Sequence, residues 1–191
     1  MVYADFSISL DGFVAGPRIG VDNPMGDGGE ALHDWMFSGK SPEEVRAFQD
    51  ERFATTGAFI MGRTMFDLGV GPWGENPPFH APVFVVTHRA AAPIVKQGGT
   101  TYTFVTDGPS AALESARAAA GDRDICVAGG AAAVQHYSNE GVIDELRLQL
   151  VPILLGDGVR LAGFDRHLAQ LELQSGVGTE GNVVHIRYRL G

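Results

Sequence analysis

Apolar and polar positions alternate along the chain in short runs, and these runs predict a series of strands and helices. From Met1 to Leu10, apolar residues alternate with small or polar ones, which is typical of a β-strand. Further apolar and β-branched runs predict strands at 58–61, 82–87, 100–106, 124–128, 146–153, 168–175 and 183–190. Helices are expected between the earlier strands, at about 41–55, 62–68, 109–120 and 129–139.

Residues that favour helix ends support two of these helices. Ser41 can cap the first one, Pro42 occupies its first position, and Glu44 can complete a capping box. Gly121 follows the alanine-rich segment 109–120 and is expected to end that helix.

Two long irregular stretches interrupt the pattern. The first, Asp11 to Lys40, is rich in glycine and contains two prolines, with a short helix expected at 30–37. The second, Gly69 to Ala81, carries Trp73 and three prolines. Loops of this length in a compact domain are often functional.

The order of the elements predicts the fold class. Strands that alternate with helices imply a mostly parallel sheet with right-handed crossovers, and the strands at the carboxyl end imply an added antiparallel edge. Neither an internal repeat nor a linker divides the chain, so a single α/β domain over 1–191 is expected.

Composition narrows the possible partners. The hydrophobic share of 45% is enough for a core, and the net charge of -9 argues against nucleic-acid or anionic-membrane binding. No apolar stretch is long enough for a membrane span, and no secretory signal is visible. The single cysteine, Cys126, excludes an internal disulfide, so the cytoplasm is the expected compartment. The six histidines lack metal-binding spacing, so no metal site is predicted.

Three turns that follow strands carry groups suited to a dinucleotide. Gly62 is expected to open a helix, whose N–H groups and dipole favour phosphate, and Arg63 adds a bidentate donor. Thr87, His88 and Arg89 end the next strand, and an arginine there suits the ribose 2′-phosphate of NADPH.

The third turn is Gly129-Gly130-Ala131-Ala132. Two glycines end a buried strand, and small residues start a helix, so a diphosphate can approach the backbone closely. The pattern is not the GxGxxG fingerprint. Each turn alone also suits a plain helix start or polar loop, and only their combination favours a cofactor.

The sequence resembles the dihydrofolate reductase superfold, and within it the reductase domain of the bacterial bifunctional riboflavin-pathway deaminase-reductase. The resemblance is carried by SISLDGFVAGP at 7–17, FIMGRTMFD at 59–67, VFVVTHR at 83–89, VAGGAAAVQHY at 127–137 and VIDELRLQLVPILLGDGVRL at 142–161. It implies a three-layer fold and an NADPH-dependent reductase of a small heterocycle, of the 5-amino-6-(5-phosphoribosylamino)uracil or the dihydrofolate type.

The resemblance also implies where the cofactor binds. Gly62, Arg63 and Thr64 would meet its phosphates, and Thr87, His88 and Arg89 would surround the adenosine ribose and its 2′-phosphate. Gly129, Gly130, Ala131 and Ala132 would pass beneath the diphosphate and nicotinamide, with a cis peptide between the two glycines. Asp11, Gly12 and the loop behind them would cover the nicotinamide.

Two departures affect the substrate side. Phe13 stands where the riboflavin-type reductases usually have lysine, and Ala128 stands where they usually have glutamate. Both changes remove a polar group, so a second hypothesis is a non-catalytic nucleotide-binding or regulatory module that retains the fold.

The proton donor stays unassigned. Asp11, Asp34 and Glu145 are candidate catalytic residues. A folate reductase usually places a carboxylate near the substrate to assist protonation, and Asp27, Glu30 and Asp34 lie in the corresponding stretch, but none matches a motif and all three are consistent with solvated loop acids.

The expected substrate pocket contains Asp11, Gly12, Phe13, Trp35 and Trp73. The two tryptophans could form an aromatic wall for a flat ring or simply pin their loops to the sheet. A homodimer is expected from the strand-rich carboxyl end and the resemblance.

Overall fold

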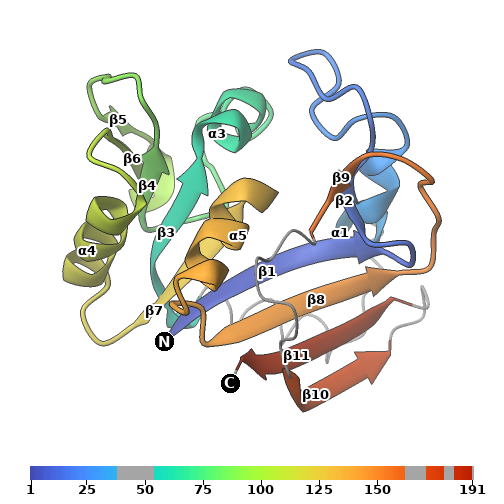
Figure 1. The fold of residues 1–191 in the computed structure, drawn as a ribbon. Coiled ribbons are helices and arrows are strands. Elements are labelled where there is room, and N and C mark those ends of the chain that lie inside the picture. The colour runs from blue at the N-terminus through green and yellow to red at the C-terminus, as the bar shows by residue number, and fades with distance from the viewer. Residues whose placement is uncertain (38–53, 162–170, 179–182, 191) are drawn as a thin grey trace.

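A nine-stranded sheet forms the centre of the computed structural model, which describes residues 1–37, 54–161, 171–178 and 183–190 (Figure 1). The strand order is β10-β11-β8-β1-β7-β3-β4-β6-β5. The bounds are β1 Val2–Ser9, β3 Thr56–Gly62, β4 Pro82–Val86, β5 Ile94–Val95, β6 Thr101–Val105, β7 Asp124–Gly129, β8 Glu145–Val151, β10 Leu171–Gly178 and β11 Val184–Leu190. Neighbours from β8 to β6 are parallel, whereas β5, β10 and β11 pair antiparallel.

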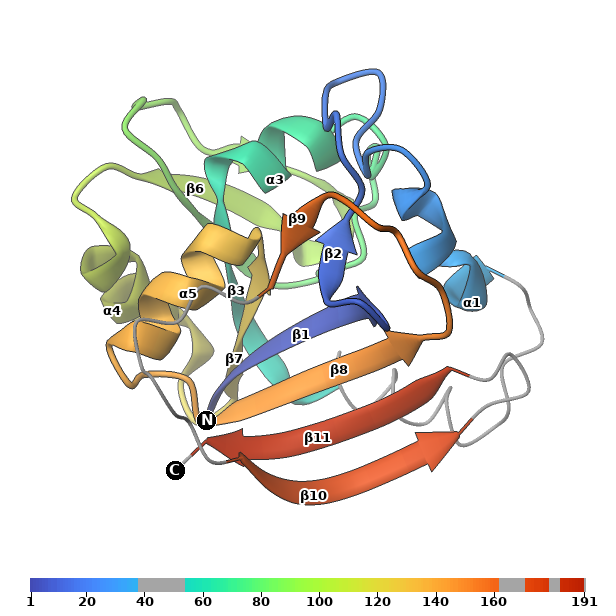
Figure 2. The ribbon, with the colours of Figure 1, turned by 45° about the vertical axis from the view of Figure 1, so that its right-hand side comes forward.

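Short helices and a second sheet surround the central one. The helical segments are η1 Gly29–Leu32, α1 Asp34–Phe37, α3 Arg63–Gly69, η2 Gln97–Gly99, α4 Pro109–Ala120 and α5 Ala131–Asn139. β2 (Phe13–Ala15) pairs antiparallel with β9 (Val159–Arg160). Figure 2 shows this small sheet above β1 and β8, between α5 and α1.

Alternate residues of the central strands enter two different apolar clusters. In β3, Ala58 and Ile60 pack with the buried faces of α4 and α5. Phe59 and Met61 point to the other face and pack with Phe66 and other aromatic residues. Both faces of the parallel sheet are therefore covered, as parallel sheets require.

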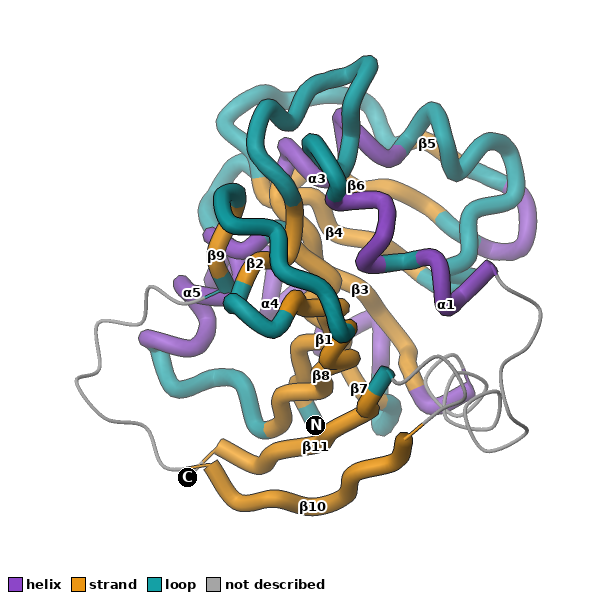
Figure 3. Tube along the Cα trace, turned by 90° about the vertical axis from the view of Figure 1, so that its right-hand side faces the viewer, coloured by secondary structure: helices purple, strands orange, loops and turns teal. Residues whose placement is uncertain are grey.

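The predicted fold class is confirmed: a mostly parallel sheet with flanking helices and antiparallel strands at the carboxyl end. Figure 3 shows β10 and β11 together at one edge of the molecule. The helix predicted at 109–120 coincides with α4. Most of the helix predicted at 41–55 lies outside the described residues.

Three parts of the structure differ from the elements that the sequence predicted. The expected short helix at 30–37 is split into η1 and α1. The strand expected at 168–175 is described at Leu171–Gly178, because pairing with β11 extends as far as Gly178 opposite Val184. β2, β5 and β9 were not predicted, because each has only two or three residues and depends on a pairing that local periodicity does not reveal.

Phe59→Ala should lower the free energy of unfolding by about 3–5 kcal/mol, because it leaves a cavity in the core. Phe59 has no exposed surface and its ring packs edge-on against Phe79, with centroids 5.1 Å apart. Chemical denaturation measures the change. Val95→Ala, at a side chain that is 76% exposed, is the control and should change stability by less than about 0.5 kcal/mol. Equal losses in both variants would contradict this account of the core.

Candidate functional site

The three predicted turns meet at one edge of the sheet. They follow β4, β3 and β7, which are neighbours, and the pairing sets Gly62 beside Val86 and Met61 beside Gly129. A side chain at Gly62 would come within 3.7 Å of the backbone nitrogen of Gly130. The parallel pairing thus brings together residues that are far apart in the sequence.

Asp67 joins the first two turns. Its Oδ1 accepts a hydrogen bond from Arg63 Nε at 2.6 Å, and its Oδ2 accepts one from Arg89 Nη2 at 3.0 Å. The Arg63 guanidinium lies 5.6 Å from the Phe66 ring centroid and 5.5 Å from that of Phe104. The two cations therefore share one anion. Sequence reasoning missed Asp67, although its i,i+4 spacing from Arg63 on a helix was a usable signal.

Hydrogen bonds of Thr87 fix the conformation of the turn that follows β4. Thr87 is buried, its N–H donates to the Val105 carbonyl at 3.1 Å, and its Oγ1 accepts from the Arg89 N–H at 3.1 Å. His88 and Arg89 are exposed, as is Thr64 after β3. The arginine side chain is therefore available at the surface of a fixed turn.

The turn after β7 has the backbone that the resemblance implies. The Gly129–Gly130 peptide is cis, and Gly129 has a φ of 138°, a backbone conformation that residues with a side chain rarely adopt. Within the described part of the chain, Gly130 caps α5 without a side-chain hydrogen bond, and a side chain at this position would meet no atom within 4 Å. The first N–H groups of an α-helix have no acceptor inside the helix, so the N–H groups of Ala131 and Ala132 are available to a bound anion.

These groups fit a phosphorylated dinucleotide. Two guanidinium groups and the amino end of a nine-residue helix lie at one edge, and all of them favour anions. Gly130 leaves open space where another residue would carry a side chain. Arg63, Arg89 and the start of α5 are the residues that would hold the phosphates.

Asp11 fixes the loop that follows β8. Its Oδ1 accepts from Ser9 Oγ at 2.6 Å and from the Leu155 N–H at 3.1 Å, and its Oδ2 accepts from the Gly156 N–H at 2.7 Å. The Ser9 hydroxyl and these backbone donors lower the pKa of Asp11 to about 2. Such a group is ionised at neutral pH, which makes it a positioning residue and a poor proton donor.

The ring of Phe13 packs against the guanidinium group of Arg160. Its side chain is buried, and the Arg160 guanidinium carbon lies 4.2 Å from its ring centroid. Arg160 Nη1 also donates to the Asp11 carbonyl at 2.9 Å, beside Gly12. Where the resemblance leads one to expect lysine at position 13, this chain places a positive charge from β9 instead.

The two tryptophans lie in different clusters. Trp35 Nε1 donates to Ser7 Oγ at 3.2 Å and to the Leu32 carbonyl at 3.0 Å. Trp73 instead packs against Phe79, with centroids 4.9 Å apart, in the core. They do not share an aromatic wall; Trp73 pins its loop, whereas Trp35 lies beside β1.

Two other predicted candidates lie away from the turns or in solvent. Glu145 is the first residue of β8, at the opposite end of that parallel strand from the three turns, and its carboxylate accepts from Arg147 Nε at 2.6 Å. Asp34 is exposed in the first turn of α1. Asp27 pairs with Arg18. The structure brings none of these acids to the three turns.

Sequence reasoning also missed a set of buried polar residues on β1 and β8. These are Ser7, Ser9, Arg147 and Gln149, all less than a tenth exposed. The signal was present: polar residues occupy every second position of both strands, although central strands of a parallel sheet are normally apolar throughout. Burial lowers the pKa of the neighbouring His185, against the opposing charge of Asp5.

Over residues 1–37, 54–161, 171–178 and 183–190, no three His, Cys, Asp or Glu side chains gather as a metal site would need. In the same part of the chain, no helix has the length and apolar character of a membrane span.

The fold is that of dihydrofolate reductase-like proteins. Residues 1–183 match the model of the RibD C-terminal domain, so the chain belongs to that family. No curated protein matches it in sequence.

Solved structures share the fold at low identity. A candidate riboflavin biosynthesis protein from a Shewanella species is 21% identical, with 100% of this chain and 98% of that one covered and a TM-score of 0.74. Dihydrofolate reductase from Enterococcus faecalis, complexed with NADP(H) and RAB-propyl, is 12% identical, with 100% and 96% covered and a TM-score of 0.57. RibD from Acinetobacter baumannii is 15% identical, with a TM-score of 0.63, and this chain spans 57% of it.

Asp11→Asn should destabilise the protein at pH 7, because the loop at 155–156 loses its anionic acceptor. The folded pKa of about 2 lies below the ordinary 3.8, so the stabilisation is present above about pH 4 and is lost as the pH falls toward 2. Urea unfolding at pH 7 and pH 3 should therefore show a gap from the wild type that narrows at pH 3. Asp122→Asn, in an exposed turn, is the control. A gap of the same size at both pH values would refute this role.

Proposed function

We propose that the protein is an NADPH-dependent reductase of a small heterocyclic compound. The observation that carries the proposal is the meeting of three anion-favouring turns at one edge of the sheet, with Arg63 and Arg89 held together by Asp67. NADPH would supply a hydride for reduction of the substrate.

The protein's own residues bind and orient the cofactor. Arg89 and His88 recognise the ribose 2′-phosphate, on a turn that the buried Thr87 shapes. Arg63 and the first N–H groups of α5 bind the diphosphate, and Gly130 lets it approach the backbone. Asp11 orders the 155–156 loop beside β2 and helps to shield the ring from water.

The substrate is a ribosylaminopyrimidine of the riboflavin pathway or a pterin of the dihydrofolate type. Membership of the RibD C-terminal domain family supports the first, and the fold shared with dihydrofolate reductase supports the second. The protein acts in the cytoplasm, and it acts as a homodimer, for which the exposed Leu171 and Leu173 on the edge strand β10 offer an apolar contact.

A non-catalytic nucleotide-binding or regulatory module is the second candidate. Phe13 and Ala128 favour it, because both replace polar groups that the related reductases keep. Sustained NADPH oxidation with any pterin or aminopyrimidine would exclude this candidate.

Arg89→Ala should weaken NADPH binding by roughly tenfold or more, because it removes a charge-assisted contact to the 2′-phosphate. NADH, which lacks that phosphate, should lose less than about threefold. Fluorescence titration of both cofactors measures the two affinities, after saturable NADPH binding by the wild type is established. Arg117→Ala, on the exposed side of α4, is the matched control. Equal losses for both cofactors would show that Arg89 does not read the 2′-phosphate.

Ala132→Asp should separate stability from binding. An acid in the first turn of α5 interacts favourably with the helix dipole, so the melting temperature should hold or rise. The same charge repels a bound diphosphate, so NADPH affinity should fall by roughly tenfold or more. Ala132→Asn provides the neutral control in calorimetry. Unchanged NADPH affinity in the Asp variant would remove the start of α5 from the cofactor site.

A further inference from the structure

Asp5 occupies a position beside the cofactor turn. β1 pairs with β7 through Tyr3 opposite Cys126 and Ala4 opposite Val127, so Asp5 lies at the level of Ala128. Tyr3, Cys126 and Ala128 belong to the same cluster, so alternation along both strands places Asp5 and Ala128 on one face. Gly129 and Gly130 follow directly. The carboxylate missing at position 128 is therefore present on the neighbouring strand.

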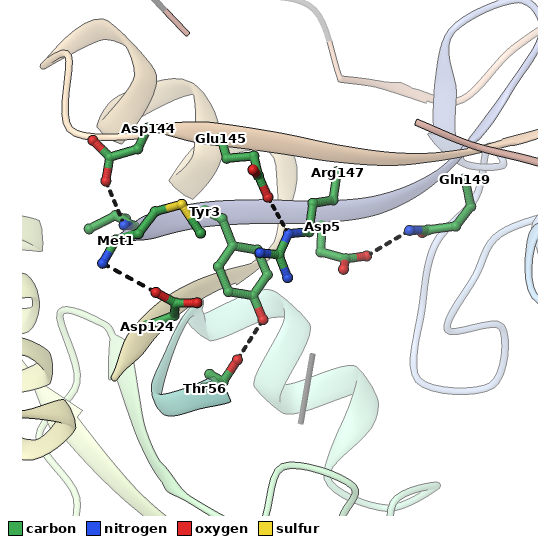
Figure 4. A network of polar contacts seen from close by, with 10 residues as sticks. Met1, Tyr3, Asp5, Thr56, Asp124, Asp144, Glu145, Arg147 and Gln149 are labelled. Carbon is green, nitrogen blue, oxygen red and sulfur yellow. Dashed lines mark hydrogen bonds and ion pairs between the residues drawn. The ribbon is translucent and has the colours of Figure 1, made fainter. Parts of the chain in front are cut away.

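Gln149 completes a polar pair with Asp5. Its Nε2 donates to Asp5 Oδ1 at 3.0 Å, from the adjacent strand β8. Figure 4 shows the two side chains pointing to one another on the same side of the sheet as Tyr3 and Arg147. Gln149 is only 5% exposed. Its amide orientation is thus fixed by the carboxylate, which leaves its oxygen as an acceptor.

Arg147 supplies a buried donor next to this pair. Its guanidinium carbon lies 3.8 Å from the Tyr3 ring centroid, its Nε donates to Glu145, and its side chain is 3% exposed. Among the residues that the structure describes, its Nη1 is buried without a hydrogen-bond partner. An unsatisfied buried donor costs free energy, and a ligand carbonyl oxygen would satisfy it.

Trp35, in α1, contacts this polar surface. Ser7, two residues after Asp5 on the same face, lies opposite Gln149 and accepts a hydrogen bond from Trp35 Nε1. A flat ring bound at Asp5 and Gln149 would thus have an indole on one side and the Gly129–Gly130 turn on the other. Such neighbours suit a planar heterocycle that receives a hydride.

We propose that Asp5 and Gln149, with Arg147 next to them, recognise the substrate, and that the substrate presents a cyclic amide or ureide edge. The carboxylate and the amide oxygen accept hydrogen bonds from ring N–H groups, and Arg147 Nη1 donates to the carbonyl between them. This inference rests on the proposed function and names the residues that determine its specificity.

The test compares two probes that differ only in ring N–H groups. 5,6-Diaminouracil presents them, and its 1,3-dimethyl derivative does not. Calorimetry with NADP⁺-loaded wild-type protein should show the unmethylated probe binding roughly tenfold more tightly or better. In Asp5→Asn the ratio should fall to within about twofold, because the anionic acceptor is gone.

Controls separate this inference from the cofactor proposal. NADPH affinity should stay within about twofold in Asp5→Asn, and Glu172→Gln, on the exposed β10 strand, should leave the probe ratio unchanged. Gln149→Met is a second variant with the same expected loss of preference, and it decides the matter if Asp5→Asn does not fold. A wild type with no preference, or variants that keep it, would overturn the inference while NADPH binding stands. A wild type that does not bind NADPH would instead remove the proposed function and this inference with it.

Discussion

Parallel pairing of β8, β1, β7, β3 and β4 is the constraint on which the candidate site depends. Because these strands run in one direction, their carboxyl ends meet at one edge, and the turns that leave them are forced together. Asp67 could join Arg63 and Arg89 only because β3 and β4 are neighbours. The same register sets Asp5 beside Ala128 and opposite Arg147. A one-residue slip between strands would move each of these side chains to the other face.

Much of this arrangement could be predicted from the sequence. Periodicity gave the strands and helices, and the rule that parallel strands end at one edge explains why three separate turns form one site. Asp5 and Gln149 were missed because alternation in β1 and β8 shows that two faces differ but not which face is buried. Asp11 was placed in the right loop as a candidate catalytic residue, but its structural role was missed, because two of its three hydrogen-bond donors, Leu155 and Gly156, lie more than 140 residues further along the chain. The β2–β9 pairing is missed for the same reason.

Burial of charge distinguishes the two halves of the site. On the side proposed for the cofactor, Arg89 is 68% exposed, so its pairing with Asp67 contributes little to stability and the arginine can exchange partners at low cost. On the β1–β8 side, Arg147 and Gln149 are buried, and a buried polar group without a good hydrogen-bond partner lowers the free energy of unfolding. The first half is suited to a ligand whose phosphates compete with surface ions. The second is suited to a ligand chosen for its hydrogen-bonding pattern.

The central place of β1 in the sheet has a consequence for biosynthesis. β1 pairs with β7 and β8, and its Val2 N–H donates a hydrogen bond to Asp144, 142 positions later. Until that part of the chain has been synthesised, β1 lacks both neighbouring strands, and Asp11 lacks the backbone N–H groups of Leu155 and Gly156 that it binds in the folded protein. Pairings this distant in sequence are entropically costly to form and slow folding. During synthesis, β1 therefore stays unpaired until β7 and β8 have emerged, and unpaired strand edges of this kind are prone to aggregation.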